Sequence, residues 1–204
     1  MESKLFTPVT FGPLTLRNRT IRSAAFESMC PGNAPSDMLL DYHRSVAAGG
    51  IGMTTVAYAA VTQSGLSFDR QLWMRPEIIP GLRRLTDAIH AEGAAAGIQL
   101  GHCGNMSHKS ICGCMPVGAS SGFNLYSPTF VRGLRADELP EMARAYGRSV
   151  NLAREAGFDS VEIHAGHGYL ISQFLSPSTN HRKDEFGGSL QNRMRFMDMA
   201  VSYT

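Results

Sequence analysis

Two histidines and a tyrosine follow a short apolar run at residues 160–163, with the spacing His164, His167 and Tyr169. The apolar run is typical of a buried strand, and the intervening glycines let the chain turn sharply after it. All three side chains can therefore point into one space. Two fixed N–H donors can stabilise negative charge on a carbonyl oxygen. A tyrosine, with an ordinary pKa of about 10, is protonated at neutral pH and can deliver a proton.

Longer motifs surround this trio. Residues 164–170 read HAGHGYL, and they are followed by QFLSP, by an N-x-R-x-D-x-FGGS run and by QNRxRF. In this order the motifs closely resemble the Old Yellow Enzyme family of FMN-dependent ene-reductases, with its dienoyl-CoA reductase and NADH:flavin oxidoreductase branches. The resemblance implies an α/β fold, the TIM (β/α)8 barrel, of which this chain holds about the first four β/α units. It also implies FMN as cofactor and NADH or NADPH as reductant.

The same resemblance implies roles for the trio. The family reduces activated C=C bonds of α,β-unsaturated carbonyl compounds, with hydride from flavin N5 going to the β-carbon and a proton to the α-carbon. His164 and His167 correspond to the donor pair for the substrate carbonyl oxygen, and Tyr169 corresponds to the proton donor. His164 is also expected to contact the flavin.

Further flavin contacts are expected at three other strand ends. The end of the first strand, at residues 22–27, corresponds to the stretch that the family runs along the flavin ring. Ser23 and Ala25 are therefore expected to contact the flavin. Phe26 stands where many members have Cys or Thr, so the side chain that bonds flavin O4 is absent. Ala60 corresponds to a small residue that approaches the flavin edge. Gln99, in the motif Gln-Leu-x-His-x-Gly, carries an amide that can both donate and accept, and such an amide is costly in an apolar strand unless it is paired.

Apolar patterning predicts alternating strands and helices along the chain. Strands are expected at 20–25, 51–57, 95–100 and 160–163, and helices at 38–48, 78–91, 137–156, 169–175 and from about 189 to the end of the sequence. Residues 5–18 predict a turn-rich lead-in with a small hairpin, and residues 101–135 a long irregular loop. The alternation favours a parallel sheet with right-handed crossovers. Residues 1–204 are thus expected to form the N-terminal half of one barrel with no second domain, since a full barrel takes about 250 residues.

Composition excludes several classes of protein. The net charge is +2 with the signs interspersed, so nucleic acid is not an expected partner. No apolar run approaches the roughly 20 residues that cross a bilayer, and the first residues lack the apolar segment of a signal peptide. Four cysteines form no disulfide framework and fit a reducing compartment. These features predict a cytoplasmic protein without a membrane partner.

Two other functions fit parts of the sequence. A metal-dependent barrel hydrolase could use His102, Cys103, His164 and His167, although Glu27 is the single obvious carboxylate to join them. His102 is otherwise expected to bond the loop backbone. A catalytically silent half-barrel is the second alternative, for which a complementary C-terminal half or further copies of the chain would be partners. Two thiols flank a glycine in the long loop, at residues 112 and 114, and are expected to be free because a single C-x-C lacks the second pair of zinc ligands.

Overall fold

The computed structural model describes residues 3–204. A parallel sheet lies at its centre, in the strand order β3–β4–β6–β10. These strands span Ile21–Arg22, Met53–Ala60, Ala95–Gly101 and Ser160–Ile163, and β5 (Leu72–Trp73) pairs with the end of β4. The four longest helices each follow one of them: α1 (Asp37–Ala48), α2 (Ile79–Ala91), α4 (Leu139–Glu155) and α6 (Leu190–Ser202). The predicted alternation of four strand–helix units is confirmed.

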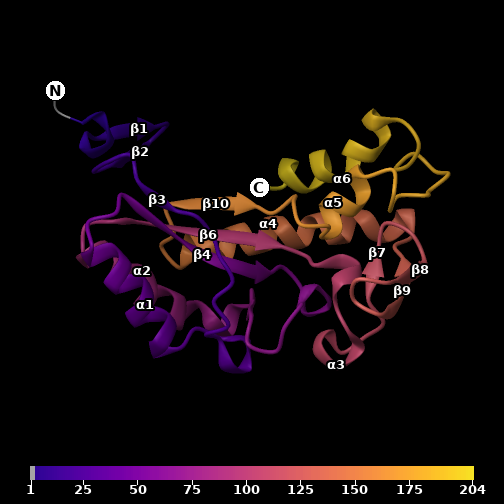
Figure 1. Ribbon diagram of the computed structural model, residues 1–204, viewed down its shortest axis with the longest axis horizontal. Helices are drawn as coiled ribbons and strands as arrows, with labels where there is room; N and C mark the ends of the chain where they lie inside the picture. Colours follow the sequence, from indigo (N-terminus) through magenta and orange to yellow (C-terminus); the bar gives the residue numbers. More distant parts are fainter. Residues whose placement is uncertain (1–2) are drawn as a thin grey trace.

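Smaller elements stand at the two ends of this sheet. The predicted hairpin is present as β1 (Val9–Phe11) and β2 (Leu14–Leu16), which pair antiparallel. Figure 1 shows it beside the ends where the strands begin, whereas α5 (Leu170–Leu175) and the β7–β9 region lie where the strands finish. Single turns of 3-10 helix occupy Lys4–Phe6, Pro31–Asn33, Gln63–Gly65, Pro76–Ile78, Gly104–Met106 and Ala136–Glu138.

Helix starts follow from the sequence. Ser36 caps α1, because its hydroxyl accepts a hydrogen bond from the Leu39 amide at 3.2 Å, and Ser189 does the same for Asn192 at the start of α6. Such caps satisfy amide groups that have no partner inside the helix. The sequence pattern predicted that the final helix continues to the end of the sequence, whereas it ends at Ser202.

The two faces of the sheet differ in character because side chains alternate along a strand. Ala96, Ile98 and Leu100 are fully buried on the face covered by helices. On the other face, a Cβ atom added to Gly97 would lie 2.9 Å from the Ser160 hydroxyl and 3.1 Å from that of Thr55. This second face, the inner face of the expected barrel, is therefore polar.

The first strand is much shorter than the predicted 20–25. Only residues 21 and 22 pair with β4, and the chain then leaves the sheet and next forms the 3-10 turn Pro31–Asn33. Side chains hold this segment against its neighbours instead, since Arg22 donates to the Thr55 carbonyl, and Glu27 accepts from the Ala57 amide and lies 3.0 Å from His43 Nε2. The second strand is shifted as well, since it begins at Met53 and extends to Ala60.

The prediction of an irregular loop over residues 101–135 was wrong. This region contains α3 (Lys109–Cys112) and a three-stranded sheet of β7 (Val117–Gly118), β8 (Gly122–Asn124) and β9 (Thr129–Gly133). The strands are two to five residues long, too short for an alternating pattern to stand out. In residues 3–204 no helix is long and apolar enough to cross a membrane.

Candidate active site

A cavity of about 200 Å³ opens at the ends of strands β3, β4, β6 and β10. Catalytic groups in barrels of alternating strands and helices lie at this end. The lining comes from all four strand ends and from the loop before β5: Ala24, Ala25, Phe26, Glu27, Ser28, Cys30, Ala57, Tyr58, Gln71, Leu72, Gln99, His164, His167 and Tyr169. The chain thus gathers in one place residues that are more than a hundred positions apart.

The trio predicted after β10 is brought together on this cavity. His164 Nε2 lies 3.1 Å from His167 Nδ1, so the two imidazoles converge on one point. The Tyr169 ring stands edge-on to His164, with 5.1 Å between ring centroids. His167 has a positive φ of 56°, a conformation that is uncommon for residues other than glycine. This turn directs its ring back toward His164.

Burial sets the protonation of these groups. It lowers the pKa of His164, and the neighbouring His167 adds to that effect, so His164 is a neutral imidazole at neutral pH. Burial also raises the pKa of Tyr169. The tyrosine therefore keeps its proton throughout the neutral range, as a proton donor must.

Tyr58 was not predicted as a site residue, yet it forms a wall of the cavity. Its ring contacts those of Tyr169 and His164 edge-on, at centroid distances of 5.2 and 6.0 Å. Its hydroxyl donates to the Gly65 carbonyl at 2.7 Å. A shift in strand register between Val56 and Ala59 accompanies this placement, and the sequence gives no signal of such a shift.

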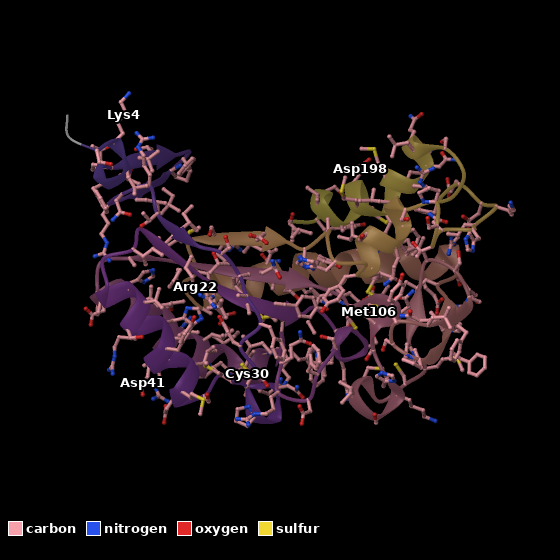
Figure 2. All side chains as sticks on the ribbon, in the orientation of Figure 1. Lys4, Arg22, Cys30, Asp41, Met106 and Asp198 are labelled. Atoms are coloured by element: carbon pink, nitrogen blue, oxygen red, sulfur yellow. The ribbon has the colours of Figure 1, made fainter. Side chains whose placement is uncertain are left out.

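Glu27 lines the cavity and is paired with Arg22, which is labelled in Figure 2. Its carboxylate is 2.7 Å from the Arg22 guanidinium and 3.0 Å from His43 Nε2, and it accepts a hydrogen bond from the Ala57 amide at 3.2 Å. Arg22 also donates to the Thr55 carbonyl of β4. These contacts fix the segment that contains Ala24 and Ala25 against the sheet. A largely buried carboxylate is expected to be paired in this way.

Gln99 lies on the cavity but is not the deeply buried amide that the sequence predicted. It is half-buried on the inner face, where its amide donates to the carboxylate of Glu162. The two residues are direct neighbours in the β6–β10 register. Glu162 had not been predicted to matter, although a charged residue inside a four-residue strand indicates a polar face.

The other predicted flavin contacts separate into two groups. Ala25 lines the cavity, together with Ala24 and Ala57. Ser23 is exposed outside that lining. Ala60 is fully buried in a cluster with Leu66 and Cys103 and also lies off the cavity. For Ser23 and Ala60 the cofactor contact stays a prediction without support from the cavity.

His102 and Cys103 do not join the trio. Both are fully buried. His102 accepts a hydrogen bond from the Gly104 amide at Nδ1 (2.9 Å) and lies 3.0 Å from the Ser64 hydroxyl at Nε2, which confirms its predicted bonding to the loop backbone. Within residues 3–204 no three His, Cys, Asp or Glu side chains are grouped as metal ligands. The ligand set of the hydrolase alternative is therefore not assembled.

The cavity fits the ring system of FMN better than its phosphate. Three alanines give a flat wall that a planar ring can approach closely, and Gln99 supplies an amide that donates and accepts. The lining contains no lysine or arginine, although a phosphate group needs such cations or helix N-termini. These residues would hold the flavin ring, and the phosphate would be bound elsewhere.

Comparison with known proteins agrees with this arrangement. The NADH:flavin oxidoreductase / NADH oxidase family matches residues 4–202. A 4,4'-dithiodibutanoate disulfide reductase of Rhodococcus erythropolis is 42% identical over 94% of this chain and 48% of its own length. An NADPH dehydrogenase of Bacillus subtilis is 37% identical over 97% of this chain and 58% of its own length. The chain thus spans about half the length of the curated relatives it matches.

Solved structures give the same result for the fold. The old yellow enzyme homologue from Zymomonas mobilis superposes with a TM-score of 0.91 and 29% identity, over 98% of this chain and 59% of that one. Morphinone reductase in complex with tetrahydroNAD gives a TM-score of 0.91 and 29% identity over 99% and 60%. With its four strand–helix units, the chain belongs to the FMN-dependent NADH:flavin oxidoreductase / NADH oxidase family and holds part of its (β/α)8 barrel, about the first four β/α units.

Proposed function

We propose that this chain contributes the substrate-reducing face of an FMN-dependent ene-reductase that acts on activated C=C bonds of α,β-unsaturated carbonyl compounds. The observation that carries the proposal is the convergence of His164 and His167 at 3.1 Å beside Tyr169 on one cavity. When bound, FMN supplies hydride from N5, after reduction by NADH or NADPH.

The two imidazoles bind and polarise the substrate. A carbonyl oxygen placed between His164 Nε2 and His167 Nδ1 can accept hydrogen bonds from both rings once each carries its proton on the facing nitrogen. In the cavity without substrate these two nitrogens face each other, so one of them accepts. Substrate binding then requires a change of tautomer or a small separation of the rings. Such fixed donors stabilise charge that develops on the oxygen during the reaction.

Tyr169 holds the proton that the α-carbon receives. Its raised pKa keeps the hydroxyl protonated, and its ring is wedged between those of His164 and Tyr58. This packing restricts the ring to one orientation. A proton donor is effective only when it is held within hydrogen-bond reach of the acceptor.

The proposal includes a second structural half. Strands β3 and β10 each have a single neighbour in the central sheet, and exposed strand edges invite pairing with another strand. The polar inner face and the absence of a cation from the cavity lining also support a second half of the barrel. A complementary half-barrel would cover this face and supply the phosphate site.

The replacement Tyr169→Phe tests the proposed reaction. We expect alkene reduction to slow by about 10²–10⁴-fold, because the general acid is lost, while reduction of the flavin by nicotinamide keeps its rate. Stopped-flow absorbance of the two half-reactions separates these effects. Equal loss in both half-reactions, or in neither, would exclude Tyr169 as the proton donor.

Tyr58→Phe is the matched control for this experiment. It also removes one phenolic hydroxyl from the same cavity, but that hydroxyl already donates to the Gly65 carbonyl. We expect a much smaller effect on alkene reduction. If Tyr58→Phe slowed alkene reduction as much as Tyr169→Phe does, the assignment of Tyr169 as the proton donor would be contradicted.

A further inference from the structure

Two thiols meet at the end of α3, away from the active-site cavity. Cys112 is the last residue of this helix, and Gly113 follows in the left-handed conformation, with φ of 76°. That turn brings Cys114 back toward the helix, so that the two sulfur atoms are 3.9 Å apart. All four cysteines of the chain are free thiols.

The sulfur separation matches a shared metal ion and not a bond between the sulfurs. A disulfide needs its sulfur atoms about 2.0 Å apart, whereas here the Cys114 thiol donates a hydrogen bond to the Cys112 sulfur. An ion with metal–sulfur bonds of about 2.3 Å would fit between sulfurs 3.9 Å apart with an angle of roughly 116° at the metal. This angle is close to that of trigonal coordination.

The surroundings offer soft ligands and few others. Cys114 and Met115 both border a second cavity of about 610 Å³, which lies between α4 and the turn after α3. Three carboxylates line this cavity, and each is ion-paired: Asp137 with Arg135 at 3.0 Å, Glu138 with Arg132 at 2.7 Å, and Glu141 with Arg148 at 2.8 Å. In the part of the chain that the structure describes, no three His, Cys, Asp or Glu side chains are grouped as metal ligands, so the four such ligands of a tetrahedral zinc site are not assembled around the pair.

We propose that Cys112 and Cys114 form a binding site for a soft monovalent cation, Cu(I), with the thioether of Met115 as third ligand. Thiolate and thioether sulfur select this class of ion, and a low coordination number suits it. Binding replaces the two thiol protons by one Cu(I), and no electron is transferred. The resulting site has one net negative charge, and the Arg132 guanidinium borders the same cavity.

The position of the pair allows an ion to enter. Cys112 is buried, whereas Cys114 is exposed and Met115 is about half exposed. One ligand is thus fixed by the helix while the other two face solvent. Cys30 is buried in the main hydrophobic core, and Cys103 is buried in the smaller cluster that Ile111 of α3 packs against, where its thiol donates to the Leu66 carbonyl.

Titration of the purified protein with Cu(I) tests this site. Cu(I) would be supplied as its coloured bicinchoninate complex under anaerobic, reducing conditions, and loss of colour reports transfer to the protein. We expect one Cu(I) per chain. In Cys112→Ser and in Cys114→Ser the affinity should fall by roughly a hundredfold or more, because one of two thiolates is lost. Met115→Leu should show a smaller loss.

The matched control is Cys30→Ser, which removes a thiol and leaves the pair intact. It should bind Cu(I) as the unchanged protein does, with folding of every variant checked by circular dichroism. X-ray absorption of the Cu(I) form should show a shell of sulfur ligands alone. The proposal would be overturned by equal weakening in Cys30→Ser, by no weakening in the two pair variants, or by tight binding of Zn(II) with none of Cu(I).

Discussion

Two histidines occupy the same place in successive units of the fold, yet they do different things. His102 is the first residue after β6, and His164 is the first residue after β10. His102 is sealed into the interior with both ring nitrogens hydrogen-bonded to protein. His164 faces the cavity, and its Nε2 is 3.1 Å from another imidazole.

Strand register explains the difference. Ile163 of β10 pairs with Leu100 of β6, so His164 lies level with Gly101 and His102 is one residue further along. Side chains of successive residues point to opposite faces of a sheet. His164 therefore shares the inner face with Gln99, and His102 points into the core beneath the helices. A shift of one residue in β6 would turn His102 to the inner face, and the same shift in β10 would turn His164 into the core.

The largest expected effect concerns stability. His102→Ala leaves the Gly104 amide and the Ser64 hydroxyl without their partner and opens a space in the core, so the free energy of unfolding should fall by about 3–5 kcal/mol. His164→Ala removes a side chain that is only 7% exposed, but no backbone group loses its partner, so it should cost less, about 1–2 kcal/mol. Urea denaturation measures both.

Asparagine at position 102 serves as the control. Its side-chain oxygen can accept the Gly104 hydrogen bond that Nδ1 accepts in the histidine. His102→Asn should therefore recover part of the stability that His102→Ala loses. Equal losses for the alanine variants of residues 102 and 164 would contradict the division between a structural and a functional histidine.

The second effect is a dependence of stability on pH. Burial lowers the pKa of His102 to about 3, below the value of about 6.5 expected in the unfolded chain. Between these values the unfolded chain binds a proton that the folded protein excludes. The stabilisation is complete above pH 6.5, falls by about 1.4 kcal/mol for each pH unit below it, and is lost near pH 3.

Measurements between pH 6.5 and 4.5 cover most of this contribution, which amounts to about 2.3 kcal/mol over that window because the unfolded imidazole is already half protonated at pH 6.5. Carboxylates such as Glu138, whose pKa is lowered by hydrogen bonds from Arg132, lose their contribution only at lower pH. His102→Asn should remove most of the slope. His164→Gln should remove less of it, because His164 borders an open cavity. An unchanged slope in His102→Asn would show that this imidazole is protonated in the folded protein.

The sequence was sufficient for the elements that carry strong periodic patterns. Helices α1 and α2 and strand β10 lie close to their predicted ranges, because their apolar residues recur regularly and their caps are recognisable. The trio after β10 was also predictable, since three chemically active residues follow one strand within six positions. Local information is enough for both.

What the sequence could not give depends on contacts between distant segments. Tyr58 reaches the cavity through a register shift in β4, and Glu27 acquires its role from Arg22 and His43 on separate elements. The three-stranded sheet after β6 has no strand longer than five residues. Each of these features is decided by tertiary packing, which short-range patterns do not encode.

The smallest effect concerns ligand binding at the functional histidines. Phenolic ligands carry an oxygen that can lie between His164 and His167 as a substrate carbonyl oxygen would. Removal of either imidazole by His164→Ala or His167→Ala should weaken phenol binding by at least about tenfold, or about 1.4 kcal/mol, the value of one hydrogen bond to a charged oxygen. The charge-transfer band between the phenolate and oxidised flavin reports binding.

The losses of phenol binding caused by the two substitutions should also be non-additive. Because His164 Nε2 and His167 Nδ1 are 3.1 Å apart and serve one ligand oxygen, the double variant should lose less than the sum of the two single losses. His102→Asn changes a residue that lies off the cavity and keeps the hydrogen bond to Gly104. This variant should bind phenols as the unchanged protein does. Full affinity in both alanine variants would remove His164 and His167 as the donor pair, and weak binding in His102→Asn would mean that the core histidine also shapes the site.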